Sequence, residues 1–252
     1  MSFTRHTKEE AFEQVRQLVA MFRKNLRHYK SEQYLEANCK TEFINKLLVA
    51  LNWDVDNENG VAPRYKEVIM EARTNERGTV KHPDYAICIG GRAVFYLEAK
   101  APSVKVLNDD KCAIQLRQYA SHMERPISVL TDFEEFAVYD TRKQPNEGET
   151  ADKCRVKYIT FEDYEKEFGY LWDTFSYDAV IKGSIDTYFD KTDGNYYKND
   201  IDMEMLDAME EWRVLLVKSV RAQEGRITEQ NINMAVQRLI NRMVYIWRDK
   251  GY

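Results

Sequence analysis

The sequence predicts an α/β fold followed by a helical C-terminal segment. Apolar residues recur at helical spacing in the first fifty residues, alternate at strand spacing in several short runs between residues 65 and 140, and return to helical spacing in the last fifty. The expected element order of the first part is two helices, three strands, one helix and two strands. No internal repeat is apparent.

Two amphipathic helices are expected at the start. The first has apolar residues three or four apart from Phe12 to Leu26, and the second carries a similar run from Phe43 to Leu51. A turn at residues 57–60, which contains two asparagines and a glycine, then separates these helices from a strand at residues 65–71.

The next two strands, residues 84–89 and 93–98, are expected to form a hairpin around glycine-rich residues 90–92. A three-residue loop would place Asp84 opposite Glu98, whereas a two-residue loop would place them on opposite faces. We predict the three-residue loop, because the other face then carries a continuous apolar stripe. That stripe consists of Tyr85, Ile87, Ile89, Phe95 and Leu97.

Asn108 is the expected N-cap of a helix that runs to about His122, with two aspartates in its first turn. Two short strands are expected at residues 127–131 and 135–140. The polar stretch 143–153 then reads as a surface loop.

Two domains are expected. The first spans residues 1–165, with a core at about 32–142, and residues 166–252 form a helical extension. Within the extension, apolar residues at helical spacing indicate helices around residues 205–216 and 232–247. The four tryptophans are most simply explained as core aromatics, although the last two helices could instead form a docking face.

Composition is that of a soluble globular protein, with 44% hydrophobic and 31% charged residues. The net charge is −5, and the whole acidic excess lies in residues 143–252. A front half of balanced charge would bind DNA weakly by itself, so another part would have to deliver it there. The sequence shows no apolar run of membrane-spanning length and no signal peptide, so we expect a cytoplasmic protein without membrane contact.

The four cysteines are widely separated and contain no CxxC pair, which argues against a zinc site and against a disulfide framework. We expect reduced thiols, with Cys88 packed as a small hydrophobic residue.

Acidic and basic residues gather near the hairpin. Glu98 and Lys100 lie two apart, so both project from one face of a strand that also faces Asp84 in the predicted register. Converging carboxylates suit a hard divalent cation, and the lysine would remain an ammonium group that orients water or stabilises developing charge. Glu42, on the second helix, is a candidate for an additional metal or water contact.

Gln115 and Tyr119 lie four apart on the expected third helix, so both can face the same site or bound DNA. These candidates also have simpler interpretations. Gln115 and Tyr119 could only cap and pack, and Glu42 could be a solvent-facing helix residue. His82 precedes the Pro83-Asp84 pair and is either a surface or turn residue or a group that approaches the metal.

The order Pro83-Asp84, Glu98-Ala99-Lys100, with Glu42 upstream and Gln115-xxx-Tyr119 downstream, resembles the PD-(D/E)xK nuclease superfamily. More narrowly, it is similar to the N-terminal nuclease of type I restriction R subunits and of type IIG restriction-modification enzymes. The stretches that carry this resemblance are FYLEAKAPS, AIQLRQYA, VLTDFEEFAVYDTR, KYITFEDY and the C-terminal NMAVQRLINRMVYIWRDKGY.

The resemblance implies a PD-(D/E)xK restriction-endonuclease-like mixed sheet flanked by helices, with residues 1–165 as the nuclease domain. It implies Mg²⁺, with Mn²⁺ as a substitute, held by Asp84, Glu98 and the Ala99 carbonyl, and Lys100 as the catalytic lysine. The implied activity is hydrolysis of double-stranded DNA by direct attack of water. No GxxxxGK[ST] loop or NPPY-like sequence occurs in the chain, so we expect neither translocation nor methylation in it. The resemblance also implies that methyltransferase and target-recognition domains lie elsewhere in a longer polypeptide.

Two alternatives remain open at this point. The chain could be a catalytically silent module that holds DNA or partner domains, or it could be a RecB-like repair or junction nuclease with the same chemistry and another substrate.

Overall fold

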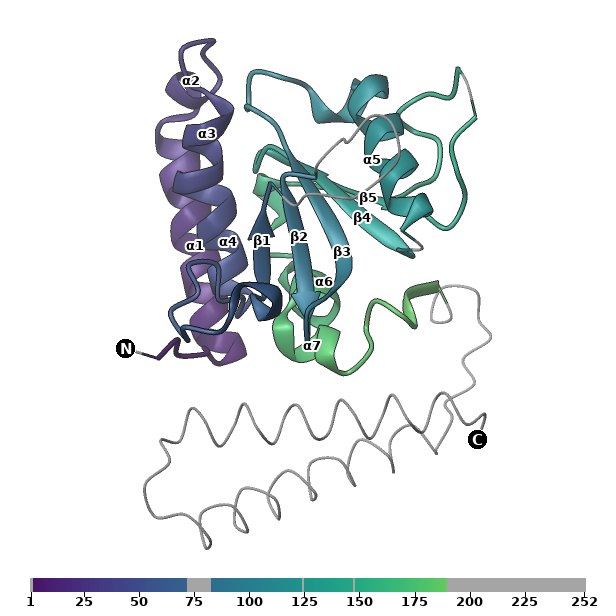
Figure 1. Cartoon of the computed structure of the whole chain (residues 1–252). Helices are drawn as coiled ribbons and strands as arrows, with labels where there is room; N and C mark the ends of the chain where they lie inside the picture. The colour runs from purple at the N-terminus through teal and green to yellow at the C-terminus, as the bar shows by residue number, and fades with distance from the viewer. Residues whose placement is uncertain (1, 72–82, 124, 147, 190–252) are drawn as a thin grey trace, which may run out of the picture. The chain divides into compact units, whose positions relative to one another are not determined.

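The structure is a computed structural model that describes residues 2–71, 83–123, 125–146 and 148–189 (Figure 1). The chain divides into two compact units, Met1–Phe189 and Asp190–Tyr252. The second unit lies outside the described residues. The same holds for His82, for Trp212 and Trp247, and for the two helices expected around residues 205–216 and 232–247.

Six strands form one sheet, in which the order in space follows the order in the chain (Figure 1). β3 and β4 are parallel and every other neighbouring pair is antiparallel, which confirms the expected mixed sheet. The strands are β1 (Val68–Met70), β2 (Tyr85–Ile89), β3 (Arg92–Ala99), β4 (Ile127–Thr131), β5 (Glu135–Asp140) and β6 (Arg155–Thr160).

Helices precede, interrupt and follow the strands. α1 begins with a complete capping box, in which the Thr7 hydroxyl accepts from the Glu10 amide and the Glu10 carboxylate accepts from the Thr7 amide. α3 continues through a π-helical turn, Lys40–Ile44, into α4. The helices are α1 (Lys8–Lys24), α2 (Leu26–Tyr29), α3 (Glu36–Cys39), α4 (Asn45–Ala50), α5 (Asp110–His122), α6 (Phe168–Phe175) and α7 (Tyr177–Ile181), with 3₁₀ turns at Pro63–Tyr65, Val106–Asn108 and Phe161–Asp163.

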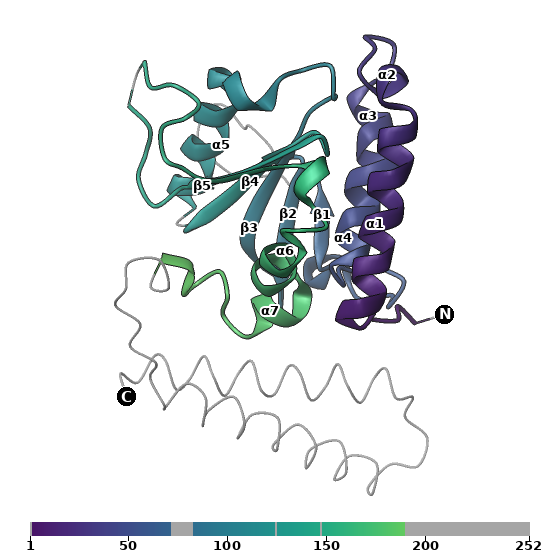
Figure 2. The same cartoon turned by 180° about the vertical axis from the view of Figure 1, so that it is seen from behind.

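Helices cover both faces of the sheet (Figures 1 and 2). Each face has its own apolar core. The larger core joins α1, α4, α6 and α7 to the inward face of the strands, where Tyr85, Ile87, Phe95 and Leu97 are buried as predicted. The smaller core packs Ala113, Leu116 and Ala120 of α5 against the opposite face of the sheet. The sheet is therefore covered on both sides, as expected for a mixed sheet that contains a parallel pair.

The hairpin between β2 and β3 reaches the predicted register near its open end by a different route. Tyr85 pairs with Leu97. The same register, continued by one residue, places Asp84 opposite Glu98, as predicted. The loop, however, has two residues, because Ile89 pairs with Arg92. Val94 is the extra residue of a β-bulge that restores the register, so the prediction of a three-residue loop was wrong.

Two further boundaries differ from the sequence analysis. α5 is capped by Asp109, whose side chain accepts from the Cys112 amide, rather than by Asn108. The sheet also continues past residue 142 with β6, and the helices α6 and α7 pack on the larger core within the unit that ends at Phe189.

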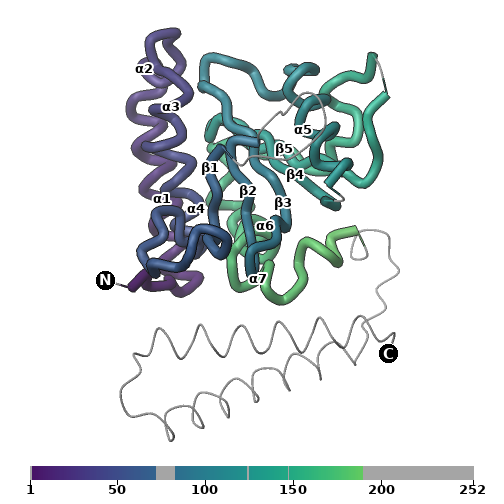
Figure 3. Tube along the Cα trace, viewed as in Figure 1, coloured from purple at the N-terminus to yellow at the C-terminus, as the bar shows by residue number. Residues whose placement is uncertain are grey.

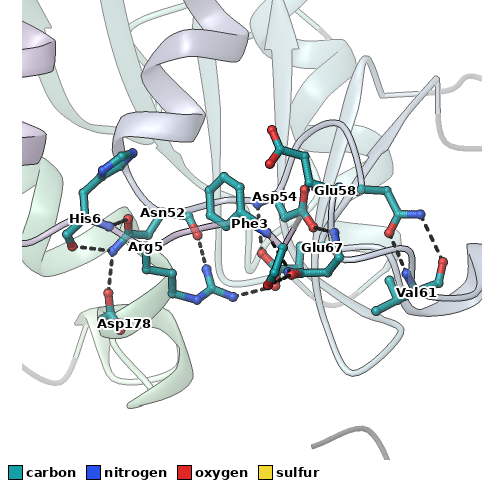
Figure 4. Close-up of polar contacts among 12 residues, drawn as sticks. Phe3, Arg5, His6, Asn52, Asp54, Glu58, Val61, Glu67 and Asp178 are labelled. Carbon is teal, nitrogen blue, oxygen red and sulfur yellow. Dashed lines mark hydrogen bonds and ion pairs between the residues drawn. The ribbon is translucent and has the colours of Figure 1, made fainter. Parts of the chain in front are cut away.

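The N-terminal segment is tied to the rest of the unit by polar contacts around Asn52 (Figure 4). The fully buried Asn52 side chain accepts from the His6 amide at 2.7 Å and donates to Asp178 at 2.9 Å. Arg5 forms an ion pair with Glu67 at 2.6 Å and also donates to the Asn52 carbonyl. These contacts join the chain start, the end of α4 and the start of α7.

Among the described residues, no helix is long and apolar enough to cross a membrane. All four cysteines are free, and Cys88 is buried at 2% exposure, as predicted for a small hydrophobic residue.

Candidate active site

The open end of the hairpin brings Asp84 and Glu98 together. Asp84 lies immediately before β2, and its Oδ2 accepts from the Ala99 backbone amide on β3 at 2.8 Å. Glu98 is nearly buried, with 9% of its side chain exposed. Burial raises the pKa of Glu98, and the neighbouring Asp84 carboxylate raises it further, while Lys100 and Tyr119 oppose the shift.

Lys100 lies at the end of β3 and contacts the same carboxylate. Its ammonium group is 3.0 Å from Glu98 Oε1, and 16% of the side chain is exposed. Burial, the largest effect, would lower the pKa of Lys100, but the Glu98 carboxylate together with Cys112 and Glu36 outweighs burial, and the net pKa is raised. Lys100 is therefore an ammonium group at neutral pH, as predicted from the sequence.

The helix α5 supplies Tyr119 from the other side of the hairpin. The Tyr119 hydroxyl donates to Glu98 Oε2 at 3.0 Å, so Glu98 is held through both of its oxygens. Gln115, one helical turn earlier on α5, is half-buried. Tyr119 thus contacts one of the predicted site residues directly.

Two residues that the sequence analysis missed reach the site from α3 and the π-helical turn. The Lys40 ammonium is 2.5 Å from Asp84 Oδ1 and 2.8 Å from Glu36 Oε1. Glu36 Oε2 is 3.8 Å from the Lys100 ammonium. The i,i+4 spacing of Glu36 and Lys40 was the sequence signal that could have identified them as neighbours on one helix face.

Glu42, the upstream carboxylate proposed from the sequence, lies in the π-helical turn beside Tyr34. Burial raises the pKa of Tyr34, and the nearby Glu42 carboxylate adds to this effect. The structure therefore brings Glu36, rather than Glu42, to within 4 Å of Lys100.

The chain between β3 and α5 leaves the sheet at this same end (Figure 3). The Lys100 amide donates to the Thr131 carbonyl at 2.9 Å, so the parallel pairing of β3 with β4 fixes the backbone at Lys100. The backbone of Ala99, which lies between the site carboxylate Glu98 and Lys100, is fully buried.

The donor set suits a hard cation. Mg²⁺ binds oxygen ligands, usually one or two protein carboxylates together with other oxygens. Asp84 and Glu98 offer carboxylates close enough for one charge to raise the pKa of the other group. In the part of the chain that the structure describes, no cluster of three or more His, Cys, Asp or Glu side chains suited to a metal occurs. A site built from the Asp84 and Glu98 carboxylates and the Ala99 backbone carbonyl would use only two such side chains.

Comparison with known proteins shows what this segment is similar to. Residues 33–147 match the family model of the type I restriction enzyme R protein N terminus, HSDR_N. The matched segment contains the site residues of α3, β3 and α5. No solved structure matches the chain.

A curated relative is the type II restriction enzyme and methyltransferase RM.Eco57I of Escherichia coli, which is 28% identical over 236 residues. The alignment covers 93% of this chain and 24% of the relative, so the chain spans about a quarter of that protein's length. Both findings confirm the resemblance drawn from the sequence. Over residues 33–147 the chain is therefore similar to the HSDR_N family, the N terminus of type I restriction enzyme R proteins.

Proposed function

We propose that this chain is the nuclease module of a restriction-modification enzyme and hydrolyses phosphodiester bonds in double-stranded DNA with the help of Mg²⁺. The observation that carries the proposal is the convergence of Asp84, Glu98 and Lys100 at one end of the β2–β3 hairpin, with Lys100 3.0 Å from Glu98. The match of residues 33–147 to the family model of the type I restriction enzyme R protein N terminus supports it.

In this proposal Asp84, Glu98 and the Ala99 carbonyl hold the cation. When bound, Mg²⁺ polarises the phosphate and stabilises the negative charge of the transition state. The Ala99 amide fixes Asp84 through Oδ2, and the Tyr119 hydroxyl fixes Glu98 through Oε2, so the two carboxylates are oriented before any ligand arrives.

Lys100 acts next to the reacting phosphate. Its ammonium group remains protonated beside Glu98, and it can therefore orient the attacking water or stabilise charge on the phosphate oxygens. The reaction is a direct attack of water, and no side chain of the site needs to form a covalent bond to DNA.

Delivery to DNA would come from elsewhere in this proposal. The acidic excess of the chain favours weak intrinsic DNA binding, and the curated relative joins restriction and methyltransferase functions in a protein of about four times this length. We propose methyltransferase and target-recognition domains as the partners of this module.

The test is cleavage of supercoiled plasmid DNA by the 252-residue chain with Mg²⁺ or Mn²⁺. We expect metal-dependent nicking or linearisation that is lost in Glu98→Gln and in Lys100→Ala, but is retained in Glu134→Gln, which alters a half-buried carboxylate paired with Lys30. Cleavage that survives both site substitutions would contradict the proposal. Metal binding without any cleavage would favour the silent module.

Closed circular DNA also distinguishes the substrate class. An endonuclease cuts a closed circle, whereas a nuclease that needs DNA ends leaves it intact and degrades only the linear form. Degradation confined to linear plasmid would favour the repair-type nuclease instead.

A further inference from the structure

Lys40 occupies the oxygen of Asp84 that the backbone leaves open. Asp84 Oδ2 is held by the Ala99 amide at 2.8 Å, whereas Oδ1 accepts from the Lys40 ammonium at 2.5 Å. Oδ1 is the oxygen that a divalent cation could bind without breaking the backbone contact between the two site strands. Lys40 and a cation at this site would therefore share one ligand.

The surroundings of Lys40 differ from those of an ordinary surface ion pair. The exposed fractions of the Lys40 and Asp84 side chains are 23% and 17%, against 42% and 67% for the pair of Lys8 with Asp173. Exposed pairs contribute little because water screens them, and a partly buried, charge-assisted contact is stronger. The Lys40 contact is therefore strong enough to influence a second cation.

Glu36 gives Lys40 a second partner. Its carboxylate lies 2.8 Å from the Lys40 ammonium and 3.8 Å from that of Lys100. Released from Asp84, the Lys40 ammonium would still have a carboxylate one helical turn away. The flexible stem of a lysine permits such a movement without a change of backbone.

We propose that Lys40 is a built-in cation of the site, which neutralises Asp84 when no metal is bound and competes with the metal for Asp84 Oδ1. This inference rests on the proposed function, because it requires a metal at Asp84. Its consequence is a positioning role: Lys40 joins Asp84 to Glu36 in the metal-free protein and weakens metal binding by the strength of its contact with Asp84. Two ligands that exclude each other lower each other's affinity reciprocally.

The experiment is calorimetric titration of Mg²⁺ into the 252-residue chain, compared with Lys40→Met and with Lys46→Met. Lys46 is exposed on α4, so its substitution removes the same charge from the same helical run without touching Asp84. We expect Mg²⁺ to bind Lys40→Met roughly five- to tenfold more tightly than the unaltered chain. Lys46→Met should leave the affinity within about twofold of the unaltered chain.

A second measurement reports the metal-free state. Thermal unfolding without metal should begin about 2–4 °C lower in Lys40→Met than in the unaltered chain, because the partly buried Asp84 loses its compensating charge. Added Mg²⁺ should remove most of this difference. Lys40→Gln, which keeps a polar end group, repeats both measurements should Lys40→Met fail to fold.

The outcomes separate the two proposals. Mg²⁺ binding by the unaltered chain with unchanged or weaker binding by Lys40→Met would overturn the role of Lys40 and leave the metal site standing. Absence of Mg²⁺ and Mn²⁺ binding in the unaltered chain and in both Lys40 variants would overturn the proposed function together with this inference.

Discussion

The Tyr119 hydroxyl donates a hydrogen bond to Glu98 Oε2 at 3.0 Å and thereby joins α5 to the end of β3. The Tyr119 ring also packs edge-on against Tyr96 at a centroid distance of 5.7 Å, so its position is set independently of the hydroxyl. The hydroxyl therefore orients Glu98 from a fixed support.

Tyr119→Phe should retain the fold and lose much of the activity. The ring contact with Tyr96 remains, but one oxygen of Glu98 loses its donor. Misplacement of the carboxylate that we propose as a metal ligand should lower kcat roughly 10- to 100-fold. Plasmid cleavage rates measured beside circular dichroism spectra check this. Tyr158→Phe is the matched control, because it removes a tyrosine hydroxyl that donates to Glu135 rather than to Glu98. Equal loss of activity in both variants would contradict a specific role for Tyr119.

Gly91→Ala should destabilise the hairpin more than Gly60→Ala. Both glycines have positive φ, +88° and +61°, so each substitution carries a backbone strain of about 1 kcal/mol. A Cβ at Gly91 would additionally lie 2.6 Å from the Arg64 carbonyl oxygen, whereas one at Gly60 meets nothing within 4 Å. We expect a further loss of about 1–3 kcal/mol for Gly91→Ala in urea unfolding. Equal free energies of unfolding for the two variants would contradict the close approach.

Asn52→Ala should destabilise the first unit by about 2–4 kcal/mol. Asn52 is fully buried at a φ of 69°, and its side chain bonds to the His6 backbone and to Asp178. Asn52→Gly relieves the backbone strain but, like Asn52→Ala, lacks the side-chain hydrogen bonds. Its free energy of unfolding should therefore lie between those of the unaltered chain and Asn52→Ala. Urea unfolding gives the three free energies, and a Gly variant as stable as the unaltered chain would show that the polar contacts contribute nothing.

Asp132 should make stability fall as pH rises. The side chain is fully buried, and burial raises its pKa well above the usual value, although the Glu135 amide opposes the shift by donating to Oδ1. In the described part of the chain, Oδ2 has no hydrogen-bond partner. A carboxyl group whose folded pKa is raised contributes stability below its unfolded pKa of about 4, and this contribution is lost as pH rises through the folded pKa.

Asp132→Asn cannot ionise and so lacks this pH dependence. The unfolding temperature of Asp132→Asn minus that of the unaltered chain should therefore increase between pH 5 and pH 8. Thermal unfolding across this range provides the measurement. A difference that is constant or decreases with pH would contradict the raised pKa of Asp132.

The hairpin shows what residue alternation can and cannot predict. Alternation correctly assigned Tyr85, Ile87, Phe95 and Leu97 to the core, because only one register buries all of them. It could not locate the extra residue. A two-glycine turn with both φ values positive matches the twist of a hairpin, so the extra residue moved to Val94 as a bulge.

The helical side of the site was predicted less well. The sequence analysis expected a helix to contribute Glu42 to the site, but the π-helical turn Lys40–Ile44 interrupts the 3.6-residue period on which face assignment depends. Glu42 therefore lies beside Tyr34, and Glu36 and Lys40 face the strands. Nothing in the local residue pattern distinguishes such a turn from a regular helix.

The sequence analysis also did not predict the last strand of the sheet, β6. The polar loop after β5 resembles a domain boundary, yet Arg117, which is 1% exposed, reaches into it and pairs with Glu149 at 2.5 Å. The chain then returns as β6 beside β5. Pairing of this kind depends on contacts distant in sequence, which periodicity does not report.

The central claim is that the Asp84 and Glu98 carboxylates bind one divalent cation together. Its most direct test is anomalous diffraction from crystals of the chain soaked in Mn²⁺. The account predicts an anomalous peak about 2 Å from a carboxylate oxygen of each residue and from the Ala99 carbonyl oxygen. Crystals that take up Mn²⁺ elsewhere, with Asp84 and Glu98 turned away from each other, would contradict it.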